Sequence, residues 1–210
     1  YPNVDSLKTS ILLTEINSSN YTLNASNLHF RVGNLINAWN VFQHFYPYFD
    51  IAKTNWNEDL RIALKESYET KEGDGYASLL KRLTAKLKDG HISVSHTGNK
   101  NFYFPPIAWT WAGKDLVITS ITDNTLELKK GDVVKRINGE DVNLYFKRVN
   151  ENISAATEGY LKHRSKIESL VGEKNTPFDL TIESDKMIKM SRSVYAPDYY
   201  PSLPKTDTIK

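Results

Sequence analysis

Hydrophobic side chains recur at helical spacing in three stretches of the first half of the chain. In residues 34–49 they fall three or four positions apart and predict a helix with one apolar face. The members of this face are Leu35, Trp39, Phe42, Phe45 or Tyr46, and Phe49. Pro47 is expected to end or kink the helix, because proline has no N–H group and crowds the preceding turn.

A second helix begins after Asn55, which can cap it, with Glu58 three residues on to complete a capping box. Its apolar side carries Leu60, Leu64 and Tyr68.

The third predicted helix starts near Asp74, and its apolar side carries Leu79, Leu80, Leu83 and Leu87. Asp89–Gly90 is expected to end it, because glycine readily takes the left-handed conformation that helix C-termini favour. Beyond this point Ile92 and Val94 alternate with serines, which is the period of a half-buried strand.

After about residue 100 the pattern becomes typical of short strands. The run "DLVITSI" predicts one strand, and "LKKGDVVKRINGEDV" predicts a second that closes in a tight hairpin turn at Asn138–Gly139. A helical stretch at about residues 158–171 ends at Gly172. The segments "FDLTIES" and "MIKMSRSV" then predict a hairpin that turns at Asp185–Lys186.

These elements divide the chain into parts of different character. Residues 1–30 are rich in Asn, Ser and Thr and read as an extended lead-in, and residues 31–100 form a small helical domain that ends in a strand. Residues 101–195 form a β-rich domain, and residues 196–210, with three of the eight prolines, read as an irregular tail. The order of a helical unit followed by a strand-rich unit predicts an α+β fold.

Composition narrows the classes of function. The net charge of +2 and the lack of a long Lys/Arg run argue against nucleic-acid binding, and no apolar stretch approaches the length of a membrane span. The chain contains no cysteine, so thiol catalysis and thiolate metal sites are excluded. Nothing in the sequence calls for a cofactor. The chain starts at Tyr1, not Met, which we interpret as a processed N-terminus, and removal of an export signal is one way to produce it.

The segment "LKDGHISVSH", residues 87–96, holds two of the five histidines. His91 and His96 lie five positions apart, so on a strand they point to opposite faces and do not converge on a metal ion. We therefore expect no metal site. His44 is expected to pack against aromatic side chains of its helix, and His29 and His163 are expected to be exposed.

Two segments resemble known domains. The string "GDVVKRINGEDV", followed by a helix and a strand, resembles the second half of a PDZ domain. The segments "RVGNLINAWNVFQHFYPYFD" and "LKDGHISV", with Trp56 between them, resemble the N-terminal part of the tricorn-like and C-terminal-processing serine peptidases. The resemblance covers about residues 30–195. It implies a three-helix unit followed by a PDZ-like β-barrel or sandwich domain with flanking helices.

In these peptidases the nucleophilic serine lies in a core domain that follows the PDZ-like unit. The present chain has no G-x-S-x-G elbow, and Ser154, in "ISAAT", falls where the resemblance places ordinary helix. The resemblance implies that His91 is the general base for that serine. The alternatives are that His91 only follows a helix end, or that the enzyme uses a Ser–Lys scheme. The implied partners are a polypeptide substrate and the downstream core domain of the same parent chain, and the implied location is secreted or periplasmic.

An alternative function is a stand-alone PDZ-like module that binds peptides without catalysis. PDZ domains hold a peptide carboxylate with backbone N–H groups of a glycine-rich loop. At that place this chain has "FPPIAWTW", and Pro105 and Pro106 cannot donate a hydrogen bond. A conventional carboxylate site is therefore not expected, and the peptide-binding residues stay unassigned.

Overall fold

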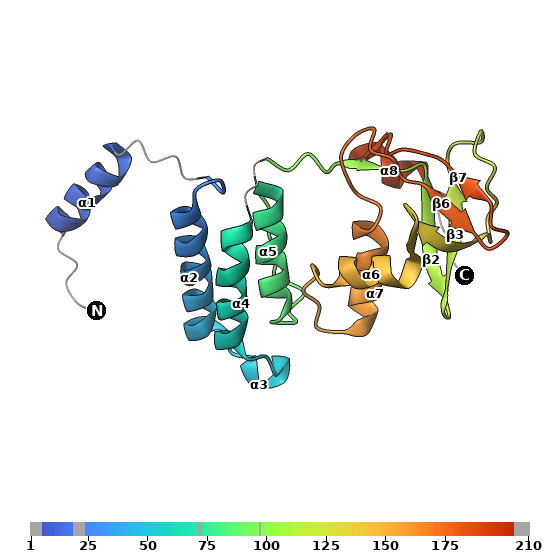
Figure 1. Cartoon of the computed structure of the whole chain (residues 1–210). Helices are drawn as coiled ribbons and strands as arrows, with labels where there is room; N and C mark the ends of the chain where they lie inside the picture. The colour runs from blue at the N-terminus through green and yellow to red at the C-terminus, as the bar shows by residue number, and fades with distance from the viewer. Residues whose placement is uncertain (1–5, 19–23, 71–72, 97, 204–210) are drawn as a thin grey trace.

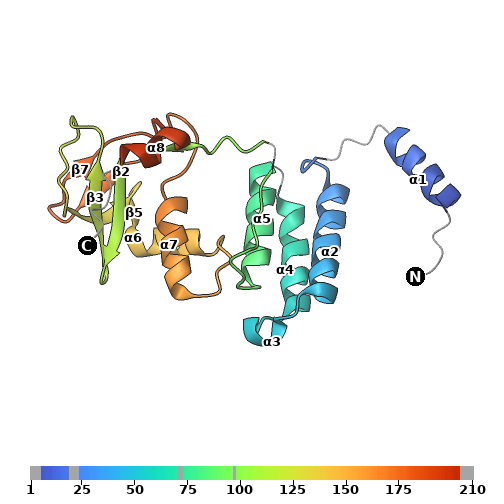
Figure 2. The same ribbon diagram turned by 180° about the vertical axis from the view of Figure 1, so that it is seen from behind.

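The computed structural model describes residues 6–18, 24–70, 73–96 and 98–203. It contains a unit of helices and a unit built on an antiparallel sheet, which lie side by side (Figures 1 and 2). Each unit has its own hydrophobic core. The α+β class expected from the sequence is confirmed.

A helix, α1 (Ser6–Ser18), occupies part of the segment expected to be an extended lead-in, so that expectation was wrong. Its sequence "SLKTSILLTEINS" contains good helix formers, but the apolar residues are spread around the helix and form no single face. A search for one apolar face therefore misses it. In both views α1 stands apart from the other helices (Figures 1 and 2), and the described side chains Ile11 and Leu13 are more than half exposed.

The helical unit consists of α2 (Leu28–Phe45), α3 (Phe49–Ala52), α4 (Trp56–Glu69) and α5 (Gly73–Ala85). As predicted, α2 ends before Pro47, and the Asn55 side chain caps α4 by accepting a hydrogen bond from the Glu58 N–H. The Glu58 carboxylate does not return the hydrogen bond that a full capping box requires. It forms an ion pair with Arg61 instead.

The core of this unit follows the predicted apolar faces. Its buried members are Leu35, Trp56, Ala63, Tyr76, Leu79, Leu83 and Leu87. Trp39 and Trp56 join α2 to α4 through two reciprocal bonds of 3.1 Å, in which each indole N–H donates to the other residue's carbonyl oxygen. Of the two alternatives left open by the sequence, Tyr46 packs on the core, whereas Phe45 is 80% exposed. Tyr68, predicted on the apolar side, is 64% exposed.

The exit from α5 differs from the sequence expectation. The residue with left-handed backbone is Lys88, at φ 52°, and not Gly90. Residues 92–96 form no strand, although Ile92 and Val94 are half-buried and the serines between them are exposed. The alternation was read correctly, but no neighbouring segment of the described chain supplies the backbone partners that a strand needs.

The second unit is built on a six-stranded antiparallel sheet in the order β2-β3-β4-β6-β7, with β5 pairing on β4. The strands are β2 (Ile107–Ala112), β3 (Asp115–Ile121), β4 (Val133–Ile137), β5 (Glu140–Asp141), β6 (Leu180–Ile182) and β7 (Met187–Ile188). A separate pair joins β1 (Tyr103–Phe104) to β8 (Val194–Tyr195). Both predicted hairpin turns are present, with positive φ angles at Asn138, Gly139 and Asp185. The described strands form no closed barrel, so the barrel alternative was wrong.

Three helices accompany this sheet: α6 (Val142–Asn150), α7 (Glu158–Glu168) and α8 (Ala196–Ser202). Helix α7 agrees with the predicted helical stretch. Helix α8 lies where an irregular tail was expected, and tertiary contacts explain the difference. Tyr199 stacks on Phe104 with ring centroids 4.1 Å apart, and its hydroxyl donates to the Ile107 carbonyl oxygen at 2.8 Å. Pro197 falls in the first turn, where a missing N–H costs no helical hydrogen bond.

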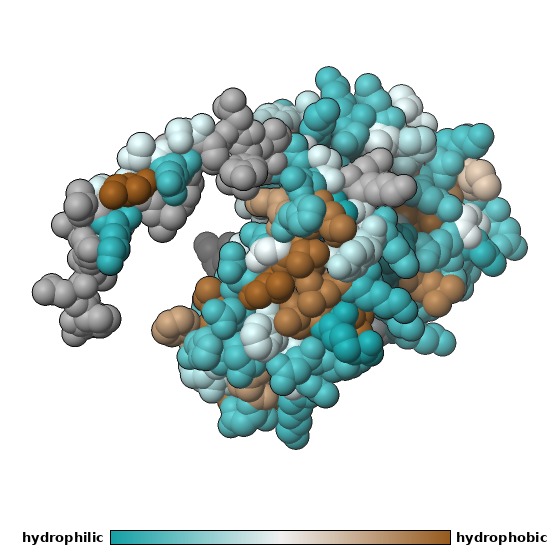
Figure 3. Space-filling model, turned by 60° about the vertical axis from the view of Figure 1, so that its left-hand side comes forward, coloured by the Kyte–Doolittle hydropathy of each residue, from teal (hydrophilic) through white to brown (hydrophobic). Residues whose placement is uncertain are grey.

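Large apolar side chains remain on the outer surface of the helical unit. Figure 3 shows hydrophobic residues gathered on the face that this view brings forward. Those more than 40% exposed on α2, α3 and the turn between them are Ile36, Val41, Phe45, Tyr48 and Ile51. A monomeric soluble protein rarely exposes a large apolar patch unless another surface covers it.

Candidate functional site

His91 lies in the loop after α5 and projects into solvent, with its side chain 98% exposed. Its ring Nδ1 lies 2.9 Å from Oδ1 of Asp89, and the same oxygen accepts the backbone N–H of His91 at 2.9 Å. One carboxylate therefore fixes both the backbone and the ring of a residue two positions along the chain.

This contact determines which ring nitrogen is free. The two hydrogen bonds from His91, that of its backbone N–H and that of its ring, hold the pKa of Asp89 below its usual range, so the carboxylate is ionised at neutral pH. An ionised carboxylate can only accept, so the proton of the neutral imidazole is on Nδ1. Nε2 then carries a lone pair directed away from Asp89. This is the tautomer that a general base needs.

Residues from three other segments hold the loop that carries His91. The hydroxyl of Tyr46, from the turn after α2, donates to the Leu87 carbonyl oxygen at 2.6 Å. The hydroxyl of Tyr160, from α7, lies 3.3 Å from the Gly90 carbonyl oxygen, and the Asp89 N–H donates to the Ser154 hydroxyl at 2.9 Å. The sheet unit thus helps to fix the candidate base.

Gly90 allows the Tyr160 ring to approach the backbone closely and has no unusual backbone angle. A Cβ atom at this position would lie 2.9 Å from the Tyr160 ring, closer than real Cβ contacts allow. The sequence analysis assigned the glycine to a helix end, whereas the structure assigns it to the contact between the two units.

Ser154 is 8% exposed and its hydroxyl accepts the Asp89 N–H. Ser154 lies in the loop between α6 and α7, so the helix expected at this position was wrong, but the expectation of a structural role agrees with this hydrogen bond. A buried hydroxyl occupied in this way is poorly placed to attack a substrate.

The remaining histidines do not join His91. His96 places Nε2 2.7 Å from Oδ1 of Asp74, at the start of α5. His29 and His163 are exposed, as predicted, but His44 is also exposed, so its expected packing against aromatic rings was wrong. It lies on the outer side of α2, because Trp39, Phe42 and Tyr46 occupy the side that faces the core. Within the described residues, no three His, Asp or Glu side chains are grouped so that they could hold a metal ion.

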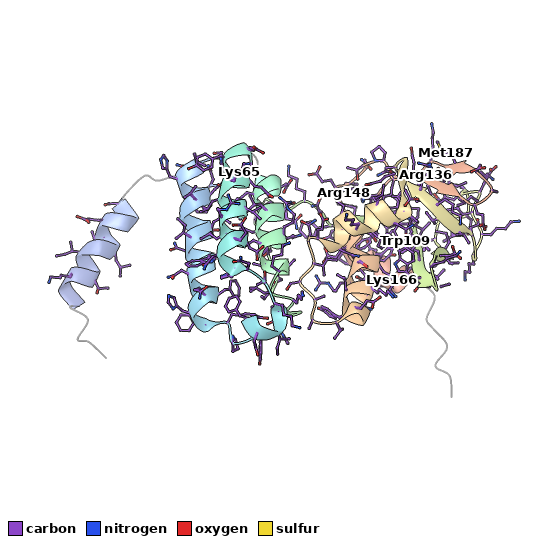
Figure 4. The ribbon with its side chains drawn as sticks, turned by 60° about the horizontal axis from the view of Figure 1, so that its bottom comes forward. Lys65, Trp109, Arg136, Arg148, Lys166 and Met187 are labelled. Carbon is purple, nitrogen blue, oxygen red and sulfur yellow. The ribbon has the colours of Figure 1, made fainter. Side chains whose placement is uncertain are left out.

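Strand β2, which follows Pro105 and Pro106, is hydrogen-bonded to α7. The Trp109 indole N–H donates to the Lys166 carbonyl oxygen at 3.0 Å, and the two residues lie close together in Figure 4. Trp109 also contacts the rings of Phe146 and Phe178. This tryptophan is therefore part of the core of the sheet unit and is not free to contact a ligand.

Sequence reasoning identified His91 but missed Asp89 as its partner, and missed Tyr160 and Ser154 as supports of the loop. The Asp89 contact had a local signal, because an Asp side chain commonly accepts the N–H two residues on. The other two are 65 and 70 residues away from the groups they bind, and nothing in the sequence marks them.

No family model matches the sequence, and no curated protein matches it. Three solved structures of CPAF, a chlamydial serine protease, are similar to the fold. Mature CPAF complexed with lactacystin has a TM-score of 0.64 at 12% identity over 86% of this chain and 39% of the CPAF chain. A CPAF mutant has a TM-score of 0.63 at 10% identity, over 78% and 34% respectively.

The chain thus spans well under half the length of the CPAF chains it matches. At this level of identity the similarity establishes the fold, which is one found within a serine protease. It does not establish membership of the tricorn-like family. Among the described helices, none is both long and apolar enough to cross a membrane.

Proposed function

We propose that this chain is the N-terminal and PDZ-like portion of a secreted or periplasmic serine endopeptidase and that it supplies the general base, His91. The single observation that carries the proposal is the Asp89–His91 pair, which fixes the ring by Nδ1 and leaves Nε2 exposed. The similarity to part of a serine protease supports the same reading.

The pair can perform the proton transfers of acyl transfer. Nε2 of His91 takes the proton of a serine hydroxyl as the oxygen attacks the substrate carbonyl, and the positive imidazolium is stabilised by the Asp89 carboxylate. The same nitrogen then gives this proton to the departing amine. The serine belongs to the downstream core domain, and the substrate is a polypeptide.

The exposed apolar residues of the helical unit support the proposal, because such a surface is expected where a chain packs against a further domain. The resemblance to tricorn-like peptidases, many of which bacteria export, supports the location outside the cytoplasm.

The test is replacement of His91 by Ala in the complete parent protein. Because the side chain is 98% exposed, folding should be unchanged, which circular dichroism checks. Loss of a positioned base should lower kcat for peptide cleavage by about 10²- to 10⁴-fold. His96→Ala is the control and should stay near the wild-type rate.

Equal activity of the two variants and the wild type would show that the base comes from elsewhere, for example from a lysine in a Ser–Lys scheme. Residues 1–210 alone should cleave nothing. Serine-dependent cleavage by this chain would contradict the statement that the nucleophile lies in another domain.

A further inference from the structure

Both polar ends of the peptide unit that joins Gly90 to His91 are held by side chains. Its N–H group, which belongs to His91, donates to Oδ1 of Asp89 at 2.9 Å. Its carbonyl oxygen, which belongs to Gly90, accepts the Tyr160 hydroxyl at 3.3 Å. Because a peptide unit is planar, the two contacts together fix the rotation of this plane, and with it the position from which the His91 imidazole projects.

Arg164, which follows Tyr160 by one turn of α7, sets the direction of this hydrogen bond. Nη1 of Arg164 lies 3.2 Å from the Tyr160 hydroxyl oxygen. A guanidinium can only donate, so it occupies a lone pair of the hydroxyl and leaves the O–H group to donate to the Gly90 carbonyl oxygen. A hydroxyl that accepts from a charged group is also a stronger donor, because successive hydrogen bonds polarise one another.

Arg164 is itself held in place and borders the loop a second time. Its Nη2 donates to Oε1 of Glu168 at 2.5 Å, and the two side chains are only 35% and 30% exposed. Arg164 and Glu168 also line a cavity of about 60 Å³ together with Ser154 and residues 92–94, the part of the loop that follows His91. Arg164 therefore lies beside the loop beyond His91 and, through Tyr160, acts on the residue before it.

We propose that Arg164 is a positioning residue for His91, which it orients through the Tyr160 hydroxyl. An ion pair four residues apart on a helix, such as that of Arg164 with Glu168, commonly does no more than stabilise the helix. The proposal goes further, because it gives Arg164 an effect on an imidazole in the other unit of the chain. The orienting role rests on the contacts alone, whereas its effect on catalysis rests on the proposed function of His91.

The first test uses residues 1–210 and needs no activity. NMR spectra of the His91 ring nitrogens report which of them carries the proton of the neutral imidazole, and in the wild type this should be Nδ1. Arg164→Met keeps an apolar stem but no donor, and Tyr160→Phe keeps the ring that packs on Gly90 but no hydroxyl. Each should lower the ratio of the Nδ1–H form to the Nε2–H form about two- to tenfold, the factor that corresponds to one lost hydrogen bond.

Two variants outside this network are the matched controls. Arg148→Met breaks an ion pair of the same kind, because Arg148 contacts Glu140 at 2.7 Å. Tyr195→Phe removes the hydroxyl of a tyrosine that is 47% exposed and whose hydroxyl makes no hydrogen bond among the described residues. Both should leave the ratio of the two His91 forms at its wild-type value, and circular dichroism checks that every variant is folded.

The second test uses the complete parent protein. Arg164→Met should lower kcat for peptide cleavage about two- to tenfold and leave KM unchanged. In the His91→Ala background the same substitution should have no further effect, because Arg164 acts only through His91. A residue that merely stabilised the fold would lower the activity by the same factor in both backgrounds.

The proposal is overturned if Arg164→Met and Tyr160→Phe leave the ratio of the two His91 forms at the wild-type value. It is also overturned if the parent loses activity with His91→Ala, but Arg164→Met leaves kcat unchanged or lowers it equally in both backgrounds. These results are separable from the test of the base. Full activity of His91→Ala would refute the proposed function, whereas a changed ratio in residues 1–210 would still support the orienting role of Arg164.

Discussion

Ser154→Ala removes the acceptor through which the sheet unit holds the candidate base. The Ser154 hydroxyl is 8% exposed and accepts the Asp89 N–H at 2.9 Å, and alanine leaves that donor without a partner in a part-buried position. Leaving a buried donor unsatisfied costs about 1–2 kcal/mol. The removed atom is small, so little packing is lost and the hydrogen bond accounts for the effect.

Two measurements check this value. Thermal unfolding of residues 1–210 should show a Tm about 2–8 °C lower for Ser154→Ala than for the wild type. Amide hydrogen exchange at Asp89 should become roughly tenfold faster, because the bond that protects this N–H is gone. Ser184→Ala is the matched control, since Ser184 is exposed on a turn and no hydrogen bond of its side chain is found among the described residues.

The reasoning is refuted if Ser154→Ala unfolds at the wild-type temperature and the Asp89 amide exchanges at the wild-type rate. In that case the loop is held by Tyr46 and Tyr160 alone, and the hydroxyl of Ser154 is dispensable.

Two further predictions concern acid and the last helix. The pKa of Asp89 is lowered in the folded chain, chiefly by the hydrogen bond from the His91 N–H. The ionised carboxylate therefore stabilises the fold at any pH above the pKa that Asp89 has in the unfolded chain. This stabilisation is lost as the pH falls through the lower pKa of the folded chain. The stability difference between the wild type and Asp89→Asn should therefore be present at neutral pH and shrink on acidification below about pH 4, measured by urea unfolding. Tyr199→Phe leaves the Ile107 carbonyl oxygen without the Tyr199 hydroxyl and should cost about 1–2 kcal/mol. Unchanged stability of this variant would show that ring stacking alone holds α8.

Features set by a few neighbouring residues could be predicted from the sequence. Pro47 ends α2 and Asn55 caps α4, because each acts on the backbone within one turn of itself. The Asn138–Gly139 turn follows in the same way, since both residues accept positive φ angles at little cost. The order of a helical unit followed by a strand-rich unit, and an exposed His91 after α5, could likewise be predicted from the sequence.

Contacts between distant segments decided the rest. The alternation of Ile92 and Val94 is local, but a strand exists only where another backbone lies alongside. Likewise α8 forms around Tyr199, whose hydroxyl partner is 92 residues away at Ile107, and so the prolines of this segment misled the prediction.

The sequence by itself determined where α2, α4, α5 and α7 lie, where the turns at Asn138–Gly139 and Asp185 fall, and that a histidine follows the third predicted helix. Only the tertiary structure decided how this histidine is held. Asp89 contacts it locally, but Ser154 and Tyr160 reach the same loop across 65 and 70 residues. The physical reason is that a side chain and its neighbours fix backbone angles over a few residues, whereas packing of the two units brings distant groups within hydrogen-bond distance.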